Sequence, residues 1–485
     1  MKAIIYAAIF SIFSIIYTNY SLASNIIIPK IGDTSSRYMS ISQENKLGNI
    51  IYSQILGSFN LISDPLITSY IQMLGDRLSI SNNNSLIKYR FLIINHPSIN
   101  AFATPGGVIV INSGVIQKTN SEAELASVLA HEIAHVKARH LSRMHEEASK
   151  VDISTALSVI ATVVAGMYDK DTLSKALITT QSFEAQKQIS FIREHEKEAD
   201  RLAINILVNA NINPKAMGSF FRTLLKENND SNSIEFLRTH PITKNRIVET
   251  ENLASKYKGS FINDSFDYQF TSVRVAMQNL NTREFIDNYN YSETEIIDSP
   301  SKAIDHYAYG LALTKEKKYK KAIIVLNNLL KFLNTKEHLL TINNHVSIAL
   351  SNAYIKNNNN KIALSILENL NNIYPTDKTI LYYLSNAYIK NKNYKKVLNK
   401  LIPYVIENKD HRLTIKISEA AYRLKEQSLG HEYKGDYLKL LGNFNSAIKF
   451  YKLALKYNMK GKTIDERILS KKKNIEKLQE TKEIL

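Results

Sequence analysis

A seven-residue string that occurs twice constrains the fold of this chain more than any other feature of its sequence. The string Ser-Asn-Ala-Tyr-Ile-Lys-Asn runs from Ser351 to Asn357 and returns unchanged from Ser385 to Asn391, an offset of 34 residues. Tyr422 lies a further 34 residues along. A period of 34 is typical of tetratricopeptide arrays, in which helical pairs stack on one another. We therefore expect an α-solenoid of four to five helical pairs. The alternative is an unrelated helical domain in which the seven-residue string recurs by chance.

A second constraint is the stretch that begins at Ser121. Its apolar residues recur at steps of three and four positions, as on a helix buried on one side, and Glu124 follows Ser121 at the spacing of a capping box. His131 and His135 are one turn apart on such a helix, so two imidazoles can bind one metal ion. Glu132 lies beside them, placed to take a proton from a water that the metal activates. The alternative is a helix whose histidines face solvent or a polar cavity.

The third metal ligand has more than one candidate. A metzincin site would need a histidine six residues after His135, but position 141 is leucine. A carboxylate from a second helix is the other common arrangement, and Glu194, Glu196 and Glu198 are all candidates. Spacing alone does not choose among them. Glu196 has one advantage, because Asp200 lies one turn on and can hold a ligating histidine through its outer N–H. The alternative is that these acids form a solvated face with neighbouring Lys and Arg.

Two short β-rich runs precede the metal-binding helix. They span residues 89–95 and 108–112, and Pro105-Gly106-Gly107 between them is a turn sequence. A strand directly before the helix can form the rim of a cleft, because an edge strand can pair with an extended peptide through its free backbone groups. The residues that we expect to offer such an edge are Gly107, Val108, Ile109 and Val110.

Composition and the N-terminus bear on where the protein works. Residues 1–23 combine Lys2, an apolar run and small residues up to Ala23, which predicts a cleaved secretory signal peptide; an uncleaved membrane anchor is the alternative. The absence of cysteine excludes disulfides and every cysteine-based zinc site or nucleophile.

The basic charge of the chain is confined to its C-terminal part. Residues 301–485 contain 34 Lys and Arg against 16 Asp and Glu, and the first 300 residues contain 28 against 29. The array is therefore expected to attract acidic partners or an anionic membrane surface. Nucleic acid fits the charge equally well, but the export signal argues against it. A lysine-rich solvated surface is the alternative.

Four motifs carry a resemblance to a known family. In chain order they are Asn100-Ala101-Phe102-Ala103-x-Pro105-Gly106-Gly107, His131-Glu132-x-x-His135, Glu196-x-x-Ala199-Asp200 and Thr239-His240-Pro241-x-x-x-x-Arg246-Ile247. Together they resemble the gluzincin metallopeptidases related to CAAX prenyl proteases. The resemblance implies a mainly α protein, with an α+β, zincin-like metalloprotease domain that holds a small sheet and a following α-solenoid of tetratricopeptide repeats.

The resemblance also implies roles for individual residues. The ligands that it implies for one Zn²⁺ per chain are His131, His135 and Glu196. Glu132 matches the catalytic base, and Asp200 matches the carboxylate that holds a ligating histidine. His240 matches a histidine that can occupy the open position of the zinc in a resting state, and Arg246 matches an arginine near the active site.

The resemblance, together with the export signal and the repeat array, implies a zinc-dependent endopeptidase of the bacterial cell envelope that degrades misfolded or stalled outer-membrane proteins and assists their assembly. We expect it in the periplasm, with protein substrates and the envelope assembly machinery bound through the basic array, peripheral membrane contact and no nucleic acid. The expected parts are a signal peptide (1–23), a metallopeptidase domain (24–260), a helical connector (261–298) and the repeat array (299–485). The alternative is a chaperone or assembly adaptor whose latched metal site rarely cuts.

Overall fold

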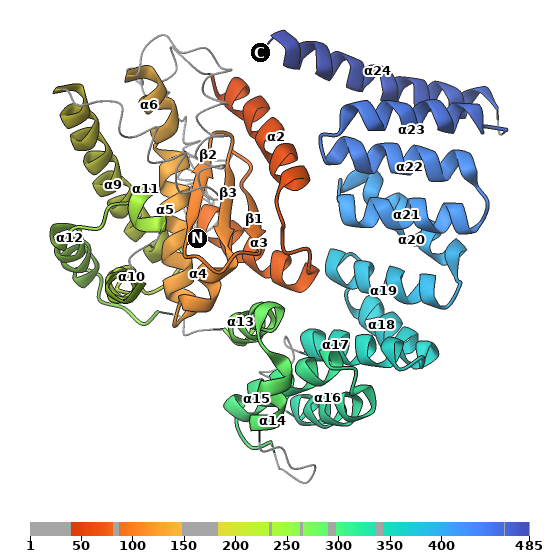
Figure 1. The fold of residues 1–485 in the computed structure, drawn as a ribbon, viewed down its shortest axis with the longest axis horizontal. Helices are drawn as coiled ribbons and strands as arrows, with labels where there is room; N and C mark the ends of the chain where they lie inside the picture. Colours follow the sequence, from red (N-terminus) through yellow and green to blue (C-terminus); the bar gives the residue numbers. More distant parts are fainter. Residues whose placement is uncertain are drawn as a thin grey trace, which may run out of the picture.

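The computed structural model of the chain describes residues 40–80, 87–147, 183–231, 235–261, 265–289, 297–335, 343–459 and 461–484. The predicted signal peptide, residues 1–23, lies outside this range. Within it the protein is mainly helical with one small sheet, which confirms the predicted fold class (Figure 1). No helix among the described residues is both long and apolar enough to cross a membrane.

The N-terminal part, residues 40–255, is called the head below. Its elements are α2 (Ile41–Ser58), α3 (Pro65–Ile80), β1 (Arg90–Ile94), β2 (Ala101–Thr104), β3 (Val108–Asn112), α4 (Ser113–Lys118), α5 (Glu122–Lys137), α6 (His140–Glu147), α9 (Phe183–Asn209), α10 (Ala216–Ser231), α11 (Glu235–Thr239) and α12 (Lys244–Ser255). Helices α13 (Phe266–Asn279) and α14 (Thr282–Asn288) follow the head and lead to the array.

Helix α5 lies at the centre of the head, packed against α3, α9, α10 and the sheet. Its apolar residues Leu125, Leu129 and Ile133 are fully buried, as the sequence period predicted. The Ser121 hydroxyl caps the helix by accepting from the Glu124 amide at 3.1 Å. The Glu124 carboxylate, however, accepts from the backbone N–H of residue 120 at 2.8 Å, one position earlier than in a standard capping box. The predicted start of the helix is therefore correct, but the Glu124 side chain bonds to the backbone of residue 120 instead of that of Ser121.

The sheet has the strand order β1-β3-β2, so β3 is the inner strand. It pairs in parallel with β1 and in antiparallel with β2, and α5 packs beside β2. The prediction that Gly107, Val108, Ile109 and Val110 offer a free edge is therefore wrong. Both sides of β3 are already paired, the three strand residues are fully buried, and the Gly107 carbonyl accepts from Arg90. The strand beside α5 that lies at the edge of the sheet is β2.

The C-terminal part is an array of stacked helical hairpins. Its helices are α15 (Pro300–Lys315), α16 (Tyr319–Asn334), α17 (Asn343–Lys356), α18 (Asn360–Ile373), α19 (Lys378–Lys390), α20 (Tyr394–Glu407), α21 (His411–Arg423), α22 (Gln427–Leu440), α23 (Phe444–Lys456) and α24 (Lys462–Ile484). The repeated string occupies equivalent places in α17 and α19, where Ala353 and Ala387 are both fully buried. Each string is followed by a turn residue with left-handed φ, Asn358 at 63° and Lys392 at 58°. The 34-residue period therefore records one structural unit.

A buried polar network joins the head to the array. The Arg274 guanidinium on α13 donates to Asp64 at 2.6 Å, to the Tyr307 hydroxyl at 3.0 Å and to the Tyr383 hydroxyl at 3.1 Å. Tyr383 in turn donates to the other Asp64 oxygen at 3.0 Å. Burial lowers the pKa of Arg274, but the Asp64 carboxylate outweighs it and raises that pKa well above its usual value. The head, the connecting helix and the array thus meet at one charged network.

Candidate metal centre

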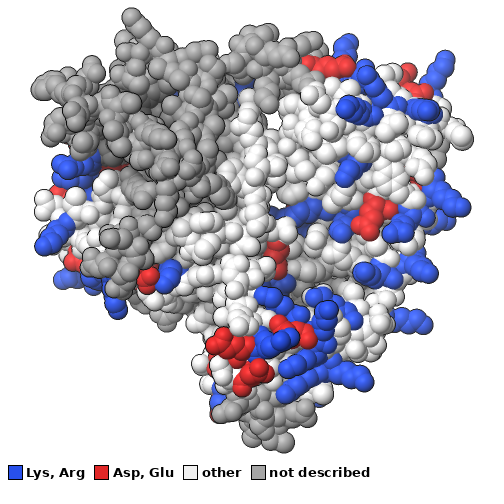
Figure 2. Space-filling model, viewed as in Figure 1, with Lys and Arg blue, Asp and Glu red and all other residues white. Residues whose placement is uncertain are grey.

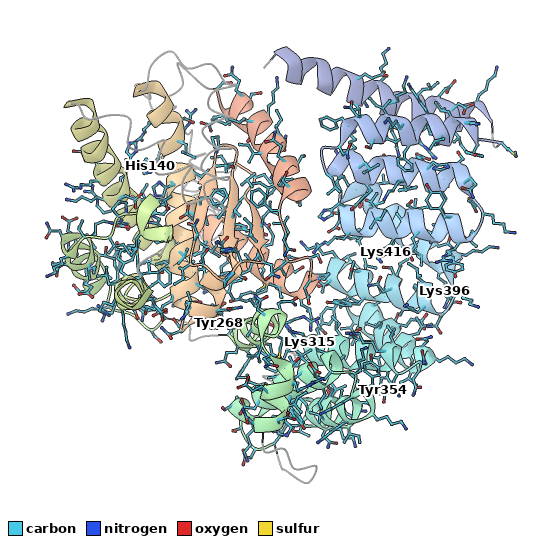
Figure 3. All side chains as sticks on the ribbon, viewed as in Figure 1. His140, Tyr268, Lys315, Tyr354, Lys396 and Lys416 are labelled. Atoms are coloured by element: carbon cyan, nitrogen blue, oxygen red, sulfur yellow. The ribbon has the colours of Figure 1, made fainter. Side chains whose placement is uncertain are left out.

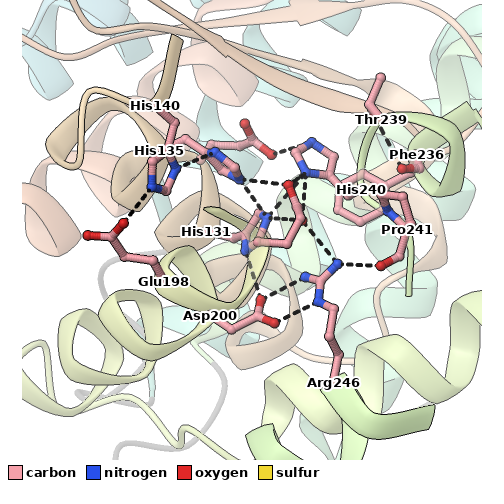
Figure 4. Close-up of polar contacts among 12 residues, drawn as sticks. His131, His135, His140, Glu198, Asp200, Phe236, Thr239, His240, Pro241 and Arg246 are labelled. Atoms are coloured by element: carbon pink, nitrogen blue, oxygen red, sulfur yellow. Dashed lines mark hydrogen bonds and ion pairs between the residues drawn. The ribbon is translucent and has the colours of Figure 1, made fainter. Parts of the chain in front are cut away.

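Two helices and one loop bring four side chains to a common point (Figure 4). His131 and His135 project from α5, Glu196 from α9, and His240 follows α11. One ligand atom from each of the four lies within 4.8 Å of the others. The Nε2 atoms of His131 and His135 are 3.0 Å apart; Glu196 Oε2 lies 3.3 Å from the first and Glu196 Oε1 lies 3.3 Å from the second.

These distances fit a metal ion. With bonds of about 2.0–2.1 Å, two ligand atoms of a tetrahedral zinc site lie roughly 3.3 Å apart. Two imidazole nitrogens and a carboxylate oxygen at this spacing form the usual donor set of a catalytic zinc site. His240 Nδ1 lies 3.3 Å from His131 Nε2 and 3.0 Å from Glu196, so it completes a fourth corner. The four side chains could hold one zinc ion, with His240 at the position that a catalytic site keeps open.

The electrostatics also indicate a place for a cation. Burial lowers the pKa of both histidines; it brings that of His135 to about 4, whereas hydrogen bonds that His131 donates to Asp200 and Glu196 outweigh it and raise the pKa of His131 to about 10. At Glu196 burial opposes ionisation, but His240 and His135 hold the pKa well below its usual value. The cluster therefore keeps an ionised carboxylate in a nearly solvent-free site, where a bound cation is favoured.

Glu132 is placed beside the cluster but outside the ligand set. Only 1% of its surface is exposed, and burial raises its pKa, partly offset by His240 and His131. Its Oε1 atom lies 3.4 Å from His240 Nε2 and has no hydrogen-bond partner among the described residues. A buried carboxylate with an unused oxygen and a raised pKa has the properties of a general base.

Asp200 and Arg246 form a support behind the ligands. An Asp200 oxygen lies 3.1 Å from His131 Nδ1, on the side of the ring that faces away from the cluster. Arg246 binds both Asp200 oxygens at 2.8 Å, and its third nitrogen lies 3.0 Å from Glu196. It also donates to the Pro241 carbonyl at 2.8 Å, next to His240. Arg246 therefore fixes Glu196, Asp200 and the loop that carries His240.

The sequence did not point to a second support, which lies behind His135. Figure 3 shows where His140 lies in the head. Its Nδ1 is 2.9 Å from Nδ1 of His135, and its Nε2 is 3.2 Å from a Glu198 oxygen (Figure 4). If His135 binds a cation through Nε2, its proton lies on Nδ1 and His140 must accept it. His140 then carries its own proton on Nε2 and donates it to Glu198. Burial lowers the pKa of His140 to about 4, so it stays neutral, as this relay requires.

We expect His140→Leu to weaken zinc binding by about 10- to 100-fold, because His135 loses the acceptor that fixes its ring and its tautomer. A competition titration with a chromogenic chelator measures this. His140→Asn, which keeps an acceptor oxygen near the Nδ1 position, is the matched control and should recover most of the affinity. Equal zinc affinity in His140→Leu and the unaltered chain would contradict the relay.

The three candidate glutamates of α9 thus have different places. Glu196 faces the two histidines, Glu198 faces His140 and Arg143 at the rim, and Glu194 is exposed. Glu196 and Asp200 share a face because they are four residues apart, whereas Glu198 lies between them on another face. The centre is also closed, because His131, Glu132, Glu196 and His240 are all buried. A cavity of about 10 Å³ beside His135 has room for one water molecule.

Comparisons with known proteins agree with this geometry. Residues 65–254 match the family model described as Peptidase family M48. The chain is 33% identical over 315 residues to a beta-barrel assembly-enhancing protease of Yersinia pestis, covering 64% of each chain. It is 34% identical over 249 residues to the protein of that name in Escherichia coli K12, covering 51% of each. Against the mitochondrial metalloendopeptidase OMA1 of Schizosaccharomyces pombe it is 28% identical over 218 residues, 44% of this chain and 61% of the relative. The chain thus spans about half to just under two thirds of these relatives, and the predicted resemblance is confirmed.

Proposed function

We propose that this chain, in which residues 65–254 form a peptidase family M48 domain, is a zinc-dependent endopeptidase. The observation that carries the proposal is the convergence of His131, His135 and Glu196, whose ligand atoms have the spacing of a tetrahedral site, beside the buried carboxylate of Glu132. We assign one zinc ion per chain to the three ligands.

Zinc bound at this point supplies an electrophile that polarises the scissile carbonyl and makes water more acidic. The remaining steps belong to the chain itself. Glu132 takes the proton of the attacking water on its unpaired oxygen and returns it to the leaving amine. Its raised pKa suits both steps, because a base that must later act as an acid works best near neutral pH. Asp200 holds His131 and Arg246 holds Asp200, so the ligand geometry does not depend on the substrate.

His240 closes the centre in this structure, and we propose that it acts as a latch. Its ring lies between Glu196, at 3.0 Å, and Glu132, at 3.4 Å, so it occupies the space where a substrate carbonyl and water must meet. Phe236 packs over the ring with centroids 4.7 Å apart, and Arg246 holds the adjacent carbonyl. Cleavage then requires the loop after α11 to withdraw.

We propose that the substrates are misfolded or stalled barrel proteins of the outer membrane, and that the protein works in the periplasm. The names of the bacterial relatives support this choice, as does the sequence of residues 1–23. The array would then recruit substrates or assembly machinery through its positive charge, with peripheral membrane contact and no nucleic acid. A chaperone or assembly adaptor is the second candidate, because the closed centre would also suit a protein that rarely cuts.

Metal removal tests the proposal. The purified chain, incubated with an urea-denatured outer-membrane barrel protein after dilution, should produce fragments over hours. Dialysis against a zinc chelator should remove about one zinc per chain and stop cleavage, and added Zn²⁺ should restore both. Cleavage that continues at zinc contents near zero would rule out a metallopeptidase. Absence of cleavage by the zinc-loaded chain, together with suppressed aggregation of the barrel protein, would favour the adaptor.

A further inference from the structure

A large cleft separates the head from the inner side of the array. It has a volume of about 1330 Å³ and is lined on one side by residues of α2, α3 and β1. The other side consists of the start of α19, the turn before α21 and the junction of α22 with α23. The Arg274 network at the base of the array fixes the two walls relative to each other. The two walls of the cleft therefore have fixed relative positions, unlike a gap between loosely joined domains.

The walls of this cleft are strongly cationic. Seven Lys and Arg side chains line it against two acidic ones. Both acids are already engaged: Asp410 binds Arg412 at 2.9 Å and caps α21, and Asp76 accepts from Gln72 at 2.8 Å. Figure 2 shows Lys and Arg spread over the array, including the region where it faces the head. An uncompensated charge of this size in a concave site attracts and concentrates anions.

Lysines supply most of this uncompensated charge. The five that line the cleft without an ion pair to any described residue are Lys46, Lys88, Lys378, Lys409 and Lys439. Burial lowers the pKa of both Lys378 and Lys439. At Lys378 Arg412 lowers it further and Asp410 raises it, and at Lys439 Asp436 raises it and Lys409 lowers it, with the net pKa below the usual value at both lysines. Three of these lysines come from the array. An anion bound between them would relieve the repulsion that the empty walls maintain.

The shape and the remaining lining residues indicate what kind of anion fits. The volume exceeds the roughly 300–1000 Å³ of small-molecule pockets. Apolar side chains, among them Ile50, Leu61, Leu441 and Phe444, share the walls with the lysines. The inner surface of a helical repeat array is also the surface that such arrays use for extended polypeptides. A polypeptide segment that carries several carboxylates beside apolar residues matches this lining.

The cleft lies next to the proposed metal centre. Gly106, in the turn between β2 and β3, lines the cleft and also the small cavity beside His135. Helix α2 separates the two spaces: Lys46 faces the cleft, whereas Glu44 faces the end of α5 and binds Arg139 at 2.9 Å. A chain held in the cleft is therefore separated from the cavity beside His135 only by α2 and the turn at Gly106.

We propose that this cleft is a docking site for acidic polypeptide segments, which positions a bound protein beside the metal centre. The docking itself requires only the lysines of the cleft. Its link to cleavage rests on the proposed peptidase function, so the test separates the two.

Binding is measured with the full chain carrying Glu132→Gln, so that cleavage does not interfere. The probe is a fluorescent 12-residue peptide with alternating glutamate and leucine, and the cleft variant combines Lys378→Gln, Lys409→Gln and Lys439→Gln. The control variant combines Lys361→Gln, Lys395→Gln and Lys449→Gln, three exposed lysines of α18, α20 and α23 that do not line the cleft. Both variants lose the same charge, and circular dichroism checks that both are folded.

The cleft variant should raise the Kd for the acidic peptide at least tenfold, and the control should change it less than threefold. A peptide with lysine in place of glutamate should not bind. If both variants lost the same affinity for the acidic peptide, the peptide would be attracted by net charge alone, and this result would overturn the proposal. Tighter binding of anionic lipid vesicles or of single-stranded RNA than of the peptide, lost in the cleft variant, would assign the site to another ligand and overturn the proposal. None of these outcomes bears on whether the zinc centre cleaves.

Discussion

Replacing Glu132 by glutamine should abolish peptide hydrolysis, with a loss of about 10²- to 10⁴-fold in turnover, while zinc content stays near one per chain. The amide has nearly the shape of the carboxylate but cannot accept the proton of the attacking water. The residue is buried and touches His240 rather than the ligand atoms of His131 or His135, so the metal should remain. Turnover of a quenched fluorescent peptide and zinc analysis of the same sample measure the two effects.

Glu194→Gln is the matched control for this change. It makes the same chemical substitution on α9, two residues from Glu196, but at an exposed position. Its turnover should stay within twofold of that of the unaltered chain. Hydrolysis retained by Glu132→Gln at normal zinc content would show that another group is the base. In cells, an adaptor should keep its activity with this substitution, and a peptidase should lose it.

His240→Ala should have the opposite effect to Glu132→Gln, because it should raise basal proteolysis several-fold. The substitution opens the corner that His240 Nδ1 occupies, 3.3 Å from His131 Nε2, and frees the space in front of Glu132. Because His131, His135 and Glu196 remain, zinc should be retained. The visible spectrum of the cobalt-substituted protein should change as one nitrogen ligand is lost. Initial rates on a casein substrate, compared at equal zinc content, give the size of the effect.

Thr239→Ala is the control for this latch. It alters the neighbouring side chain, which donates to the Phe236 carbonyl, but leaves the imidazole in place. Its turnover and cobalt spectrum should resemble those of the unaltered chain. A rate for His240→Ala that is unchanged or lower would speak against the latch and would give His240 a supporting role instead.

The parts of this structure that the sequence predicts well are those whose signals are local. The apolar period of α5 and the Ser121 cap depend on residues within a few turns, and both are found as expected. The repeated string of the array is equally clear, because it recurs at the period of one helical unit and places Ala353 and Ala387 at equivalent buried positions. The pair His131 and His135 follows from helix geometry alone.

The parts that the sequence leaves open depend on how distant segments meet. Whether Glu194, Glu196 or Glu198 faces the histidines depends on the rotation of α9 against α5, which no spacing within α9 fixes. The position of β3 inside the sheet depends on β2, a four-residue strand too short for a clear pattern.

His140 was missed for a related reason. The chain turns between α5 and α6 at Arg139, whose φ of 56° is unusual for a residue other than glycine. A salt bridge at 2.9 Å to the buried Glu44 of α2 holds this conformation. The approach of His140 to His135 is thus set by a contact with a helix some 95 residues earlier in the chain.

The most direct test of the metal centre is a crystal structure of the zinc-loaded chain, with anomalous differences measured on both sides of the zinc absorption edge. We expect one zinc peak per chain, about 2.0–2.2 Å from Nε2 of His131, Nε2 of His135 and a Glu196 oxygen, with His240 or a water as the fourth ligand. A peak elsewhere in the chain, or one at this point without Glu196 among its ligands, would contradict this expectation.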